Sequence, residues 1–293
     1  MWLGLCANAP GLSTPAILRN MESVCLRGGD LHAALAWLRA EPGVLVWVER
    51  TEGSAPREPG AWMLVGAQRV LGTIGGGQLE WSAIQQARAG LQQPGWAGQA
   101  LRCALGPSLG QCCGGVVHLR LQRVTAADAA ALRAAWVDER VPVALFGGGH
   151  VGQAIERALR PLPFALTWID SRDGVFPTDL PPTVVAEHSD PVERAVADLP
   201  PGSRVLVMSF SHAEDLAVVD ACLQRLRQQD DLPFIGLIGS RTKWAAFQHR
   251  LLARGHDASA LARVTCPVGI PGIQGKEPAV IAAAVAAQLL MTR

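Results

Sequence analysis

Tyrosine is absent from the 293 residues of this sequence, and aromatic residues make up only 5% of it. The absence of tyrosine excludes dehydrogenases whose catalytic acid is the phenol of a Tyr-Lys pair, whereas those that use His or Lys stay open. Long apolar runs are also missing from the sequence. The C-terminal VIAAAVAAQLL is too short to span a bilayer and suits a buried helix.

An excess of charge of one sign is absent as well, because 26 Lys and Arg face 25 Asp and Glu, giving a net charge of +1. Binding to phosphate backbones needs a basic patch, so nucleic acid is not expected as the main partner. The hydrophobic fraction of 49% is enough for a sizeable core. The length predicts two domains or one large one.

The seven cysteines, an odd number at irregular spacing, do not match a secreted disulfide framework. Reduced thiols are typical of the cytoplasm, which is the location that the sequence predicts. The N-terminal MWLGLCANAP lacks the basic start of a signal peptide. Residues 1–20 are either a disordered tail or lie upstream of a true start at Met21, and both interpretations stay open.

The pattern of apolar residues changes along the chain and predicts an α/β protein with two domains. Residues 21–124 mix helical and strand periods and predict a smaller N-terminal α+β domain. Residues 125–140 are expected to form a connecting helix, opened by a capping box of Thr125 and Asp128. Residues 141–293 alternate strands with helices, which predicts a C-terminal Rossmann-like, doubly wound parallel sheet.

The stretch GGGHVG follows a predicted strand and opens a predicted helix. Gly147, Gly149 and Gly152 would permit a tight turn, close approach of a phosphate, and close packing of helix on strand. His150 is a further candidate because it opens this helix, whose N-terminus attracts anions. Asp170, eighteen residues after Gly152, ends the next strand, where an acid would hold a ribose hydroxyl. A glycine turn that binds nothing is the alternative.

A second glycine-rich stretch, GTIGGGQLE, offers consecutive backbone N–H groups as an anion-binding nest, although a flexible turn is an equal alternative. Upstream, GSAPREPG holds an arginine in a loop fixed by proline. Its guanidinium is expected to pair with a phosphate or carboxylate, and an ordinary surface arginine is the alternative. The candidate residues in these two stretches are Ser54, Arg57, Gly75, Gly76 and Gly77.

Polar residues also follow later strands of the predicted sheet. Ser211 and His212, in MSFSHAED, lie at its carboxyl edge, where ligands bind, although Ser211 is equally suited to cap a helix. Lys276 and Glu277 follow the segment TCPVGIPGIQG, whose many prolines and glycines are typical of structural packing or of a lid over a site.

Two adjacent cysteines, Cys112 and Cys113, lie between glycines in LGQCCGG. Their spacing is wrong for a disulfide between them and for a zinc motif. Small neighbours and nearby backbone N–H groups favour accessible thiols of lowered pKa. Three roles stay open: ligation of a soft metal centre, transfer of persulfide sulfur, or no role.

The motifs taken together resemble the XdhC family of xanthine dehydrogenase accessory proteins. The resemblance begins near residue 30, follows the family order to the C-terminus, and leaves residues 1–20 outside. The stretches that carry it are GSAPREPGAWMLV, GTIGGGQLEWSAI, LGPSLGQCCGG, LFGGGHVGQAI, WIDSRDGVFP, GLIGSRTK and CPVGIPGIQGKEPAVIAAAVAAQLL.

The resemblance implies a chaperone for the molybdenum cofactor, a molybdopterin, rather than an enzyme. Such proteins protect the cofactor while a terminal oxo ligand is exchanged for sulfido, with sulfur from a cysteine desulfurase. They receive the cofactor from its biosynthesis proteins, pass it to the large subunit of xanthine dehydrogenase or a related hydroxylase, and are usually homodimers. The target hydroxylase and the pterin form stay open.

Two other functions remain possible from the residues alone. GGGHVG with Asp170 fits an NAD(P)-dependent oxidoreductase, and it fits a regulatory module that senses a nucleotide. Asp170 is the residue that the cofactor hypothesis explains least. An acid at this position predicts a bound ribose, which the cofactor need not contain. It either has a role in the fold or indicates that a nucleotide form of the cofactor is bound.

Overall fold

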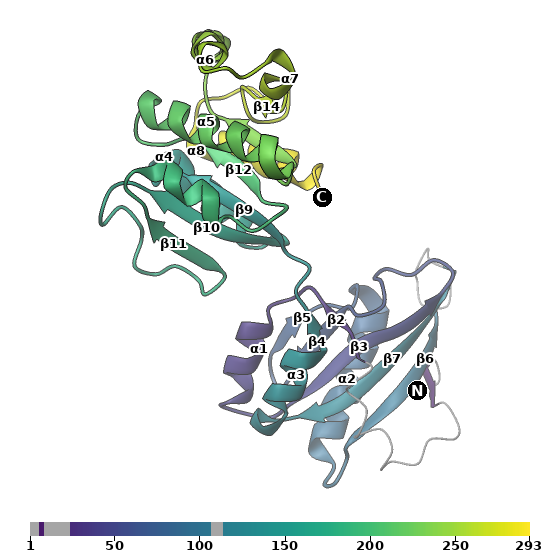
Figure 1. Cartoon of the computed structure of the whole chain (residues 1–293). Helices are drawn as coiled ribbons and strands as arrows, with labels where there is room; N and C mark the ends of the chain where they lie inside the picture. Colours follow the sequence, from purple (N-terminus) through teal and green to yellow (C-terminus); the bar gives the residue numbers. More distant parts are fainter. Residues whose placement is uncertain (1–5, 9–23, 107–113) are drawn as a thin grey trace. The chain divides into compact units, whose positions relative to one another are not determined.

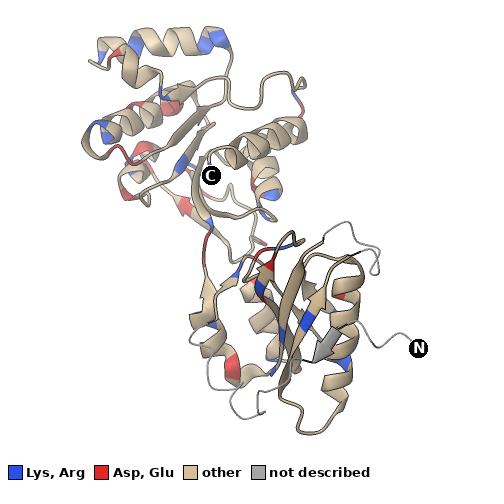
Figure 2. Ribbon diagram, turned by 90° about the vertical axis from the view of Figure 1, so that its right-hand side faces the viewer, with Lys and Arg blue, Asp and Glu red and all other residues tan. Residues whose placement is uncertain are grey.

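The computed structural model describes residues 6–8, 24–106 and 114–293, which divide into two compact units (Figure 1). The first unit spans Met1–Glu139 and the second spans Arg140–Arg293. Charges of both signs are interspersed over both units, in keeping with the small net charge (Figure 2). No helix in the described ranges is long and apolar enough to cross a membrane.

The first unit is built on an antiparallel sheet that is covered by helices on both faces. Helix α2 (Gly77–Gln92) packs on one face, and α1 (Leu31–Leu38) and α3 (Ala129–Ala135) pack on the other. Strand β3 (Gly43–Glu52) sends alternate side chains into both cores, which explains its continuous apolar run VLVWV. Among the described residues the strand order is β1 (Cys6–Asn8), β6 (Gly98–Ala104), β7 (Val116–Val124), β3, β4 (Trp62–Val65) and β5 (Val70–Gly72).

The segment predicted as a connecting helix belongs to the first unit and is shorter than expected. The predicted capping box of Thr125 and Asp128 is present and opens a 3-10 turn, Ala126–Asp128, before α3. The helix ends at Ala135 because β8 (Trp136–Val137) pairs in parallel with β2 (Leu26–Arg27).

The second unit confirms the predicted Rossmann-like fold. All its strand pairs are parallel, and the order β11-β10-β9-β12-β13-β14 is the 3-2-1-4-5-6 arrangement of dinucleotide-binding sheets. These strands are β9 (Val141–Phe146), β10 (Phe164–Asp170), β11 (Val184–His188), β12 (Arg204–Val207), β13 (Phe234–Leu237) and β14 (Val264–Thr265).

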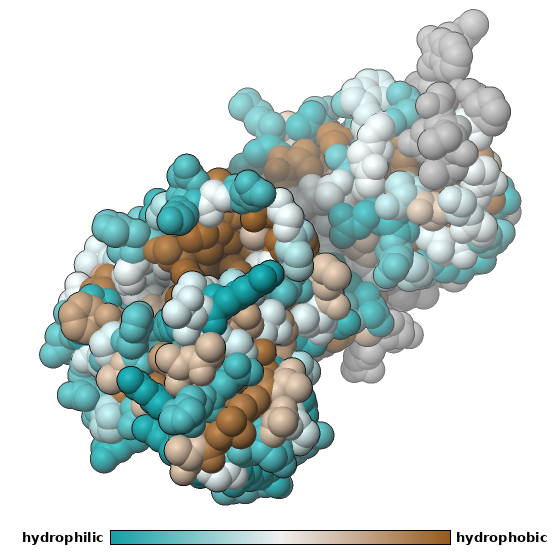
Figure 3. Space-filling model, turned by 90° about the horizontal axis from the view of Figure 1, so that it is seen from above, coloured by the Kyte–Doolittle hydropathy of each residue, from teal (hydrophilic) through white to brown (hydrophobic). Residues whose placement is uncertain are grey.

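Helices cover both faces of this parallel sheet, as burial of both faces requires. Helices α4 (His150–Leu159) and α8 (Pro278–Leu290) pack on one face. Helices α5 (His212–Gln229) and α6 (Arg241–Ala253), the short α7 (Ala258–Leu261) and the 3-10 segment Val192–Asp198 pack on the other. Apolar side chains also gather in places on the surface of this unit (Figure 3).

Two glycines of GGGHVG are required by packing, as the motif predicts. A Cβ atom on Gly147, whose φ is 121°, would lie 2.0 Å from the backbone oxygen of Met208. A Cβ atom on Gly152 would lie 2.0 Å from the backbone oxygen of Gly147. Around Gly149, by contrast, nothing lies within 4 Å of the added atom.

We predict that Gly152→Ala lowers the free energy of unfolding of the second unit by about 2–3 kcal/mol, because helix α4 must move away from the turn. Gly149→Ala is the matched control in the same motif, with a loss of at most about 1 kcal/mol at the helix cap. Urea unfolding followed by circular dichroism measures both. Equal losses in the two variants would contradict the packing argument.

Candidate functional site

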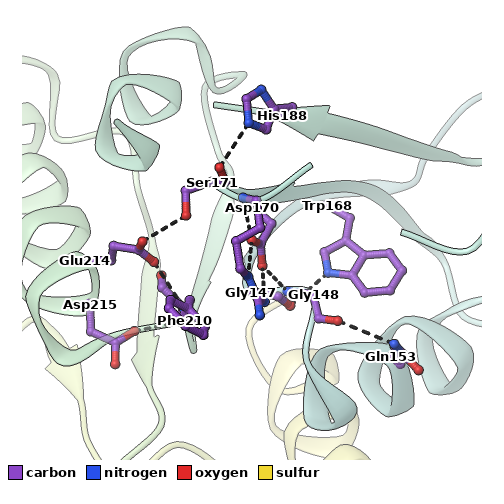
Figure 4. Close-up of polar contacts among 12 residues, drawn as sticks. Gly147, Gly148, Gln153, Trp168, Asp170, Ser171, His188, Phe210, Glu214 and Asp215 are labelled. Carbon is purple, nitrogen blue, oxygen red and sulfur yellow. Dashed lines mark hydrogen bonds and ion pairs between the residues drawn. The ribbon is translucent and has the colours of Figure 1, made fainter. Parts of the chain in front are cut away.

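The carboxylate of Asp170, at the end of β10, is fully engaged by the protein itself (Figure 4). Its Oδ2 accepts from the backbone N–H of Gly148 at 2.6 Å and from Arg172 Nη2 at 2.9 Å. Its Oδ1 accepts from the backbone N–H and from Nε of Arg172, both at 2.9 Å. The residue is only 2% exposed. In this conformation the carboxylate therefore fastens the glycine turn and leaves no oxygen for a ribose hydroxyl.

Electrostatics agree with this structural role for Asp170. Burial by itself would raise the pKa of the carboxyl, but hydrogen bonds from Arg172 and from Gly148 outweigh it and hold the pKa below its ordinary value. The acid is thus ionised at neutral pH. Of the two interpretations left open by the sequence, the contacts favour a role in the fold.

A second set of contacts links the residues that follow β10 to those that follow β12 (Figure 4). The guanidinium of Arg172 lies 4.4 Å from the ring centroid of Phe210, which follows β12. Glu214, in α5, accepts from the hydroxyl of Ser171 at 2.8 Å and from the backbone N–H of Phe210 at 3.1 Å. Because β9 lies between β10 and β12, these contacts cross the end of β9, where the glycine turn begins.

The candidates Ser211 and His212 lie at the same carboxyl edge and are partly used by the fold. Ser211 caps α5 by accepting from the backbone N–H of Glu214, as its alternative interpretation predicts. The ring of His212 makes an edge contact with Phe247, at 6.4 Å between centroids. A buried ion pair joins α5 to α6, where Lys243 Nζ donates to Asp215 Oδ2 at 2.6 Å.

In the first unit the structure brings three predicted loops together. A Cβ atom on Gly75 would lie 2.7 Å from Cβ of Pro56 and 3.3 Å from Cγ of Arg57, so the two glycine- and proline-rich loops touch. A Cβ atom on Gly115 would lie 2.4 Å from the backbone oxygen of Ser54. Gly115, the last residue of LGQCCGG, therefore lies directly beside the loop that carries Arg57. Arg57 is exposed.

The glycine nest of this unit already holds an anion, the carboxylate of Glu80. Its Oε2 accepts from the backbone N–H groups of Ile74 and Gly76, each at 3.0 Å, and from the hydroxyl of Thr73. Burial acts to raise the pKa of Glu80, but the hydrogen bonds from Thr73 and the backbone outweigh it and lower the pKa. Gly77 opens helix α2 beside this carboxylate. The predicted nest is thus present, with an internal ligand.

Cys112 and Cys113 lie outside the described residues, and so does their predicted contact with a metal. Among the residues that the structure describes, no group of three or more His, Cys, Asp or Glu side chains is placed to hold a metal ion. Of the remaining candidates, Glu277 is the N-terminal cap residue of α8, and Lys276 precedes it on the exposed surface.

Several residues of these sites were not predicted from the sequence. Glu80 stands four residues after Gly76, and Arg172 two residues after Asp170, so both lie within reach of the motifs that they complete. Phe210 carries no sequence signal of this kind, because it acts on a partner that is distant in the chain. The segment SRTK, which contains Lys243, is expected at the carboxyl edge because it follows a strand, but its pairing with Asp215 has no local signal.

Comparisons with known proteins agree with this geometry. A family model described as the XdhC Rossmann domain matches residues 143–289, half of the chain, and a model of the XdhC and CoxI family matches residues 36–98. The chain belongs to the XdhC family. The predicted family resemblance is therefore confirmed in both units.

Two relatives illustrate the extent of the family likeness. The uncharacterized protein YqeB of Escherichia coli K12 is 27% identical over 259 residues, which cover 86% of this chain but 44% of YqeB. The chain thus spans less than half the length of this curated relative. A Bacillus halodurans crystal structure, described as a xanthine dehydrogenase, matches with a TM-score of 0.67 at 18% identity. The match covers 90% of this chain and 96% of that one, and it shows a shared fold.

We predict that Asp170→Asn destabilises the second unit by about 2–3 kcal/mol at neutral pH, because the Gly148 and Arg172 contacts lose a charged acceptor. A carboxyl with lowered pKa stabilises above its ordinary value of 3.8 and loses this effect as the pH falls through the lower folded value. The difference between variant and wild type should therefore shrink in acid. Urea titrations between neutral pH and pH about 3 measure this.

The matched control for that experiment is Asp173→Asn, three residues further on, whose side chain is 94% exposed. We expect a change within about 0.5 kcal/mol for it. If Asp173→Asn lowered the free energy of unfolding as much as Asp170→Asn does, the effect would come from removing any negative charge in this loop and not from the contacts of Asp170.

We predict that Glu80→Ala lowers the stability of the first unit by about 1–2 kcal/mol, because the nest then lacks its acceptor. Added phosphate should restore part of the loss by occupying the same N–H groups. Thermal unfolding in phosphate and in chloride at equal ionic strength measures this. Glu58→Ala, at an exposed position of the neighbouring loop, is the control and should respond equally to both salts.

Proposed function

We propose that this protein binds the molybdenum cofactor, protects it during sulfuration, and inserts it into xanthine dehydrogenase or a related molybdenum hydroxylase. Membership of the XdhC family supports an accessory role of this kind. The observation that carries the proposal is the close approach of Gly115 to Ser54, which sets the end of the two-cysteine segment against the loop of Arg57.

The residues of the first unit fit the chemistry of the cofactor. Arg57 is exposed, and no hydrogen bond or ion pair of its side chain occurs within the described part of the chain, so its charge is available to an anionic group. Thiolates are the protein ligands that suit soft metal centres, and Cys112 and Cys113 supply two of them. When bound, the cofactor would supply the molybdenum centre that the finished hydroxylase uses.

The proposed role is that of a carrier rather than of an enzyme. Its partners would be the cofactor biosynthesis proteins, a cysteine desulfurase and the large subunit of the hydroxylase, with the carrier itself a homodimer. The NAD(P)-dependent oxidoreductase is the weaker hypothesis, because the carboxylate of Asp170, the expected ribose contact, already accepts hydrogen bonds from Gly148 and Arg172.

We predict that the chain, purified without oxygen from a host that makes the cofactor, carries close to one molybdenum and one pterin per chain. Metal analysis and fluorescence of the released, oxidised pterin measure the two. Cys112→Ala and Cys113→Ala should each lower the retained molybdenum about tenfold, because each removes a soft contact. Arg57→Gln should lower retention of the pterin.

Cys25→Ala is the control, because Cys25 is an exposed free thiol of the same unit but of another segment. It should retain the cofactor as the wild type does. Equal retention by both loop variants and the control would remove the cysteine pair from the function. A preparation without any pterin, in a host whose other molybdenum enzymes are loaded, would contradict the proposal itself.

A further inference from the structure

The second unit contains a cavity that none of the predicted site residues lines. Its volume is about 470 Å³, within the usual range of small-molecule sites. It lies at the carboxyl edge of the sheet, where Ile238 and Gly239 follow β13, and the segment 267–273 together with Gly275 forms one wall. Helix α8 closes the other side with Val280 and Ile281. This edge is where ligands bind in doubly wound sheets.

The lining combines an apolar surface with one charge. Isoleucine, valine and proline side chains predominate, and glycines of the 267–275 segment bring backbone groups to the wall. Ile273 contributes an apolar side chain that is 49% exposed. Arg241 is the one charged residue of the lining, and its side chain has no hydrogen bond or ion pair with any residue that the structure describes.

The direction of helix α6 adds to the positive potential of this cavity. Arg241 is the first residue of α6, and Val280 and Ile281 belong to the first turn of α8. Both helices therefore begin at the cavity. The N-terminus of α6 favours an anion there, whereas at α8 the N-terminal cap residue is the acid Glu277, whose carboxylate lies beside Gly275. Nearby, Lys243 is neutralised by Asp215, so the positive charge that the lining offers to a ligand is that of Arg241.

The glycine turn, by contrast, offers less to a ligand in this conformation. The N–H of Gly148 donates to Asp170, and Arg172 lies over the ring of Phe210 across the end of β9. The cavity beside β13 therefore provides the open volume and the unneutralised charge that the turn lacks.

We propose that this cavity binds a heteroaromatic ring system that carries one phosphate or carboxylate group. The ring lies between the aliphatic side chains of Ile273 and Ile281, its polar edge meets backbone groups of the glycine-containing segment, and Arg241 pairs with the anion. Pterins and nucleoside monophosphates share this chemistry. The site stands on the cavity alone and does not depend on the proposed carrier function.

The test is a titration of the full chain with two probes, pterin-6-carboxylate and AMP, followed by calorimetry for both and also by fluorescence anisotropy for the pterin. We expect Arg241→Gln to weaken binding about tenfold through loss of a charge-assisted hydrogen bond. Ile273→Ser should weaken it about threefold through loss of apolar contact. The matched controls are Arg250→Gln and Leu252→Ser, exposed residues of α6 outside the cavity, of which Leu252 is 50% exposed.

Each result decides the proposal. Binding of either probe that falls in the Arg241 and Ile273 variants but not in the controls supports the site, and the preferred probe identifies the ring. Failure of both probes to bind, or equal weakening in the controls, overturns it. Retention of the molybdenum cofactor is measured separately. A failure of the carrier proposal therefore does not overturn the proposed cavity site, and a failure of the cavity site does not overturn the carrier proposal.

Discussion

The second unit depends on one carboxylate, that of Asp170, more than on any other polar group described above. It joins the turn after β9, through Gly148, to the residue that follows β10, through Arg172. Arg172 in turn lies against Phe210, which follows β12. Three neighbouring strand ends are thereby fixed relative to one another by a group that is 2% exposed. An unpaired charge at this depth would be strongly destabilising, so the surrounding donors are required together.

The same solution occurs independently in the first unit. There Glu80 accepts from the backbone N–H groups of Ile74 and Gly76. In each unit a glycine-rich loop with the form of an anion site is therefore stabilised by an acid of the protein itself. Glycine motifs report backbone geometry, and the same geometry serves an internal carboxylate as well as an external phosphate. The motif alone does not distinguish the two.

The architecture was largely predictable because it follows from periodicity. Alternating strands and helices predicted the parallel sheet, and Thr125 with Asp128 predicted a helix start that the structure contains. The end of that helix was not predictable, since Trp136 and Val137 pair with Leu26 and Arg27, more than a hundred residues away. Contacts such as Arg172 with Phe210, and the cavity beside β13, likewise depend on strand order, which local pattern does not determine.

The internal acceptor Glu80 has a consequence for the timing of ligand exchange. A loop whose N–H groups already donate to an internal carboxylate keeps its conformation whether or not a ligand is present. Binding of a ligand beside the loop then requires little ordering of the backbone, and its dissociation leaves no backbone N–H group without an acceptor. The loop therefore keeps its conformation when no ligand is bound, and it need not refold when a ligand leaves. For the carrier proposed above, the rate of transfer would then be set by the contacts of the bound ligand itself.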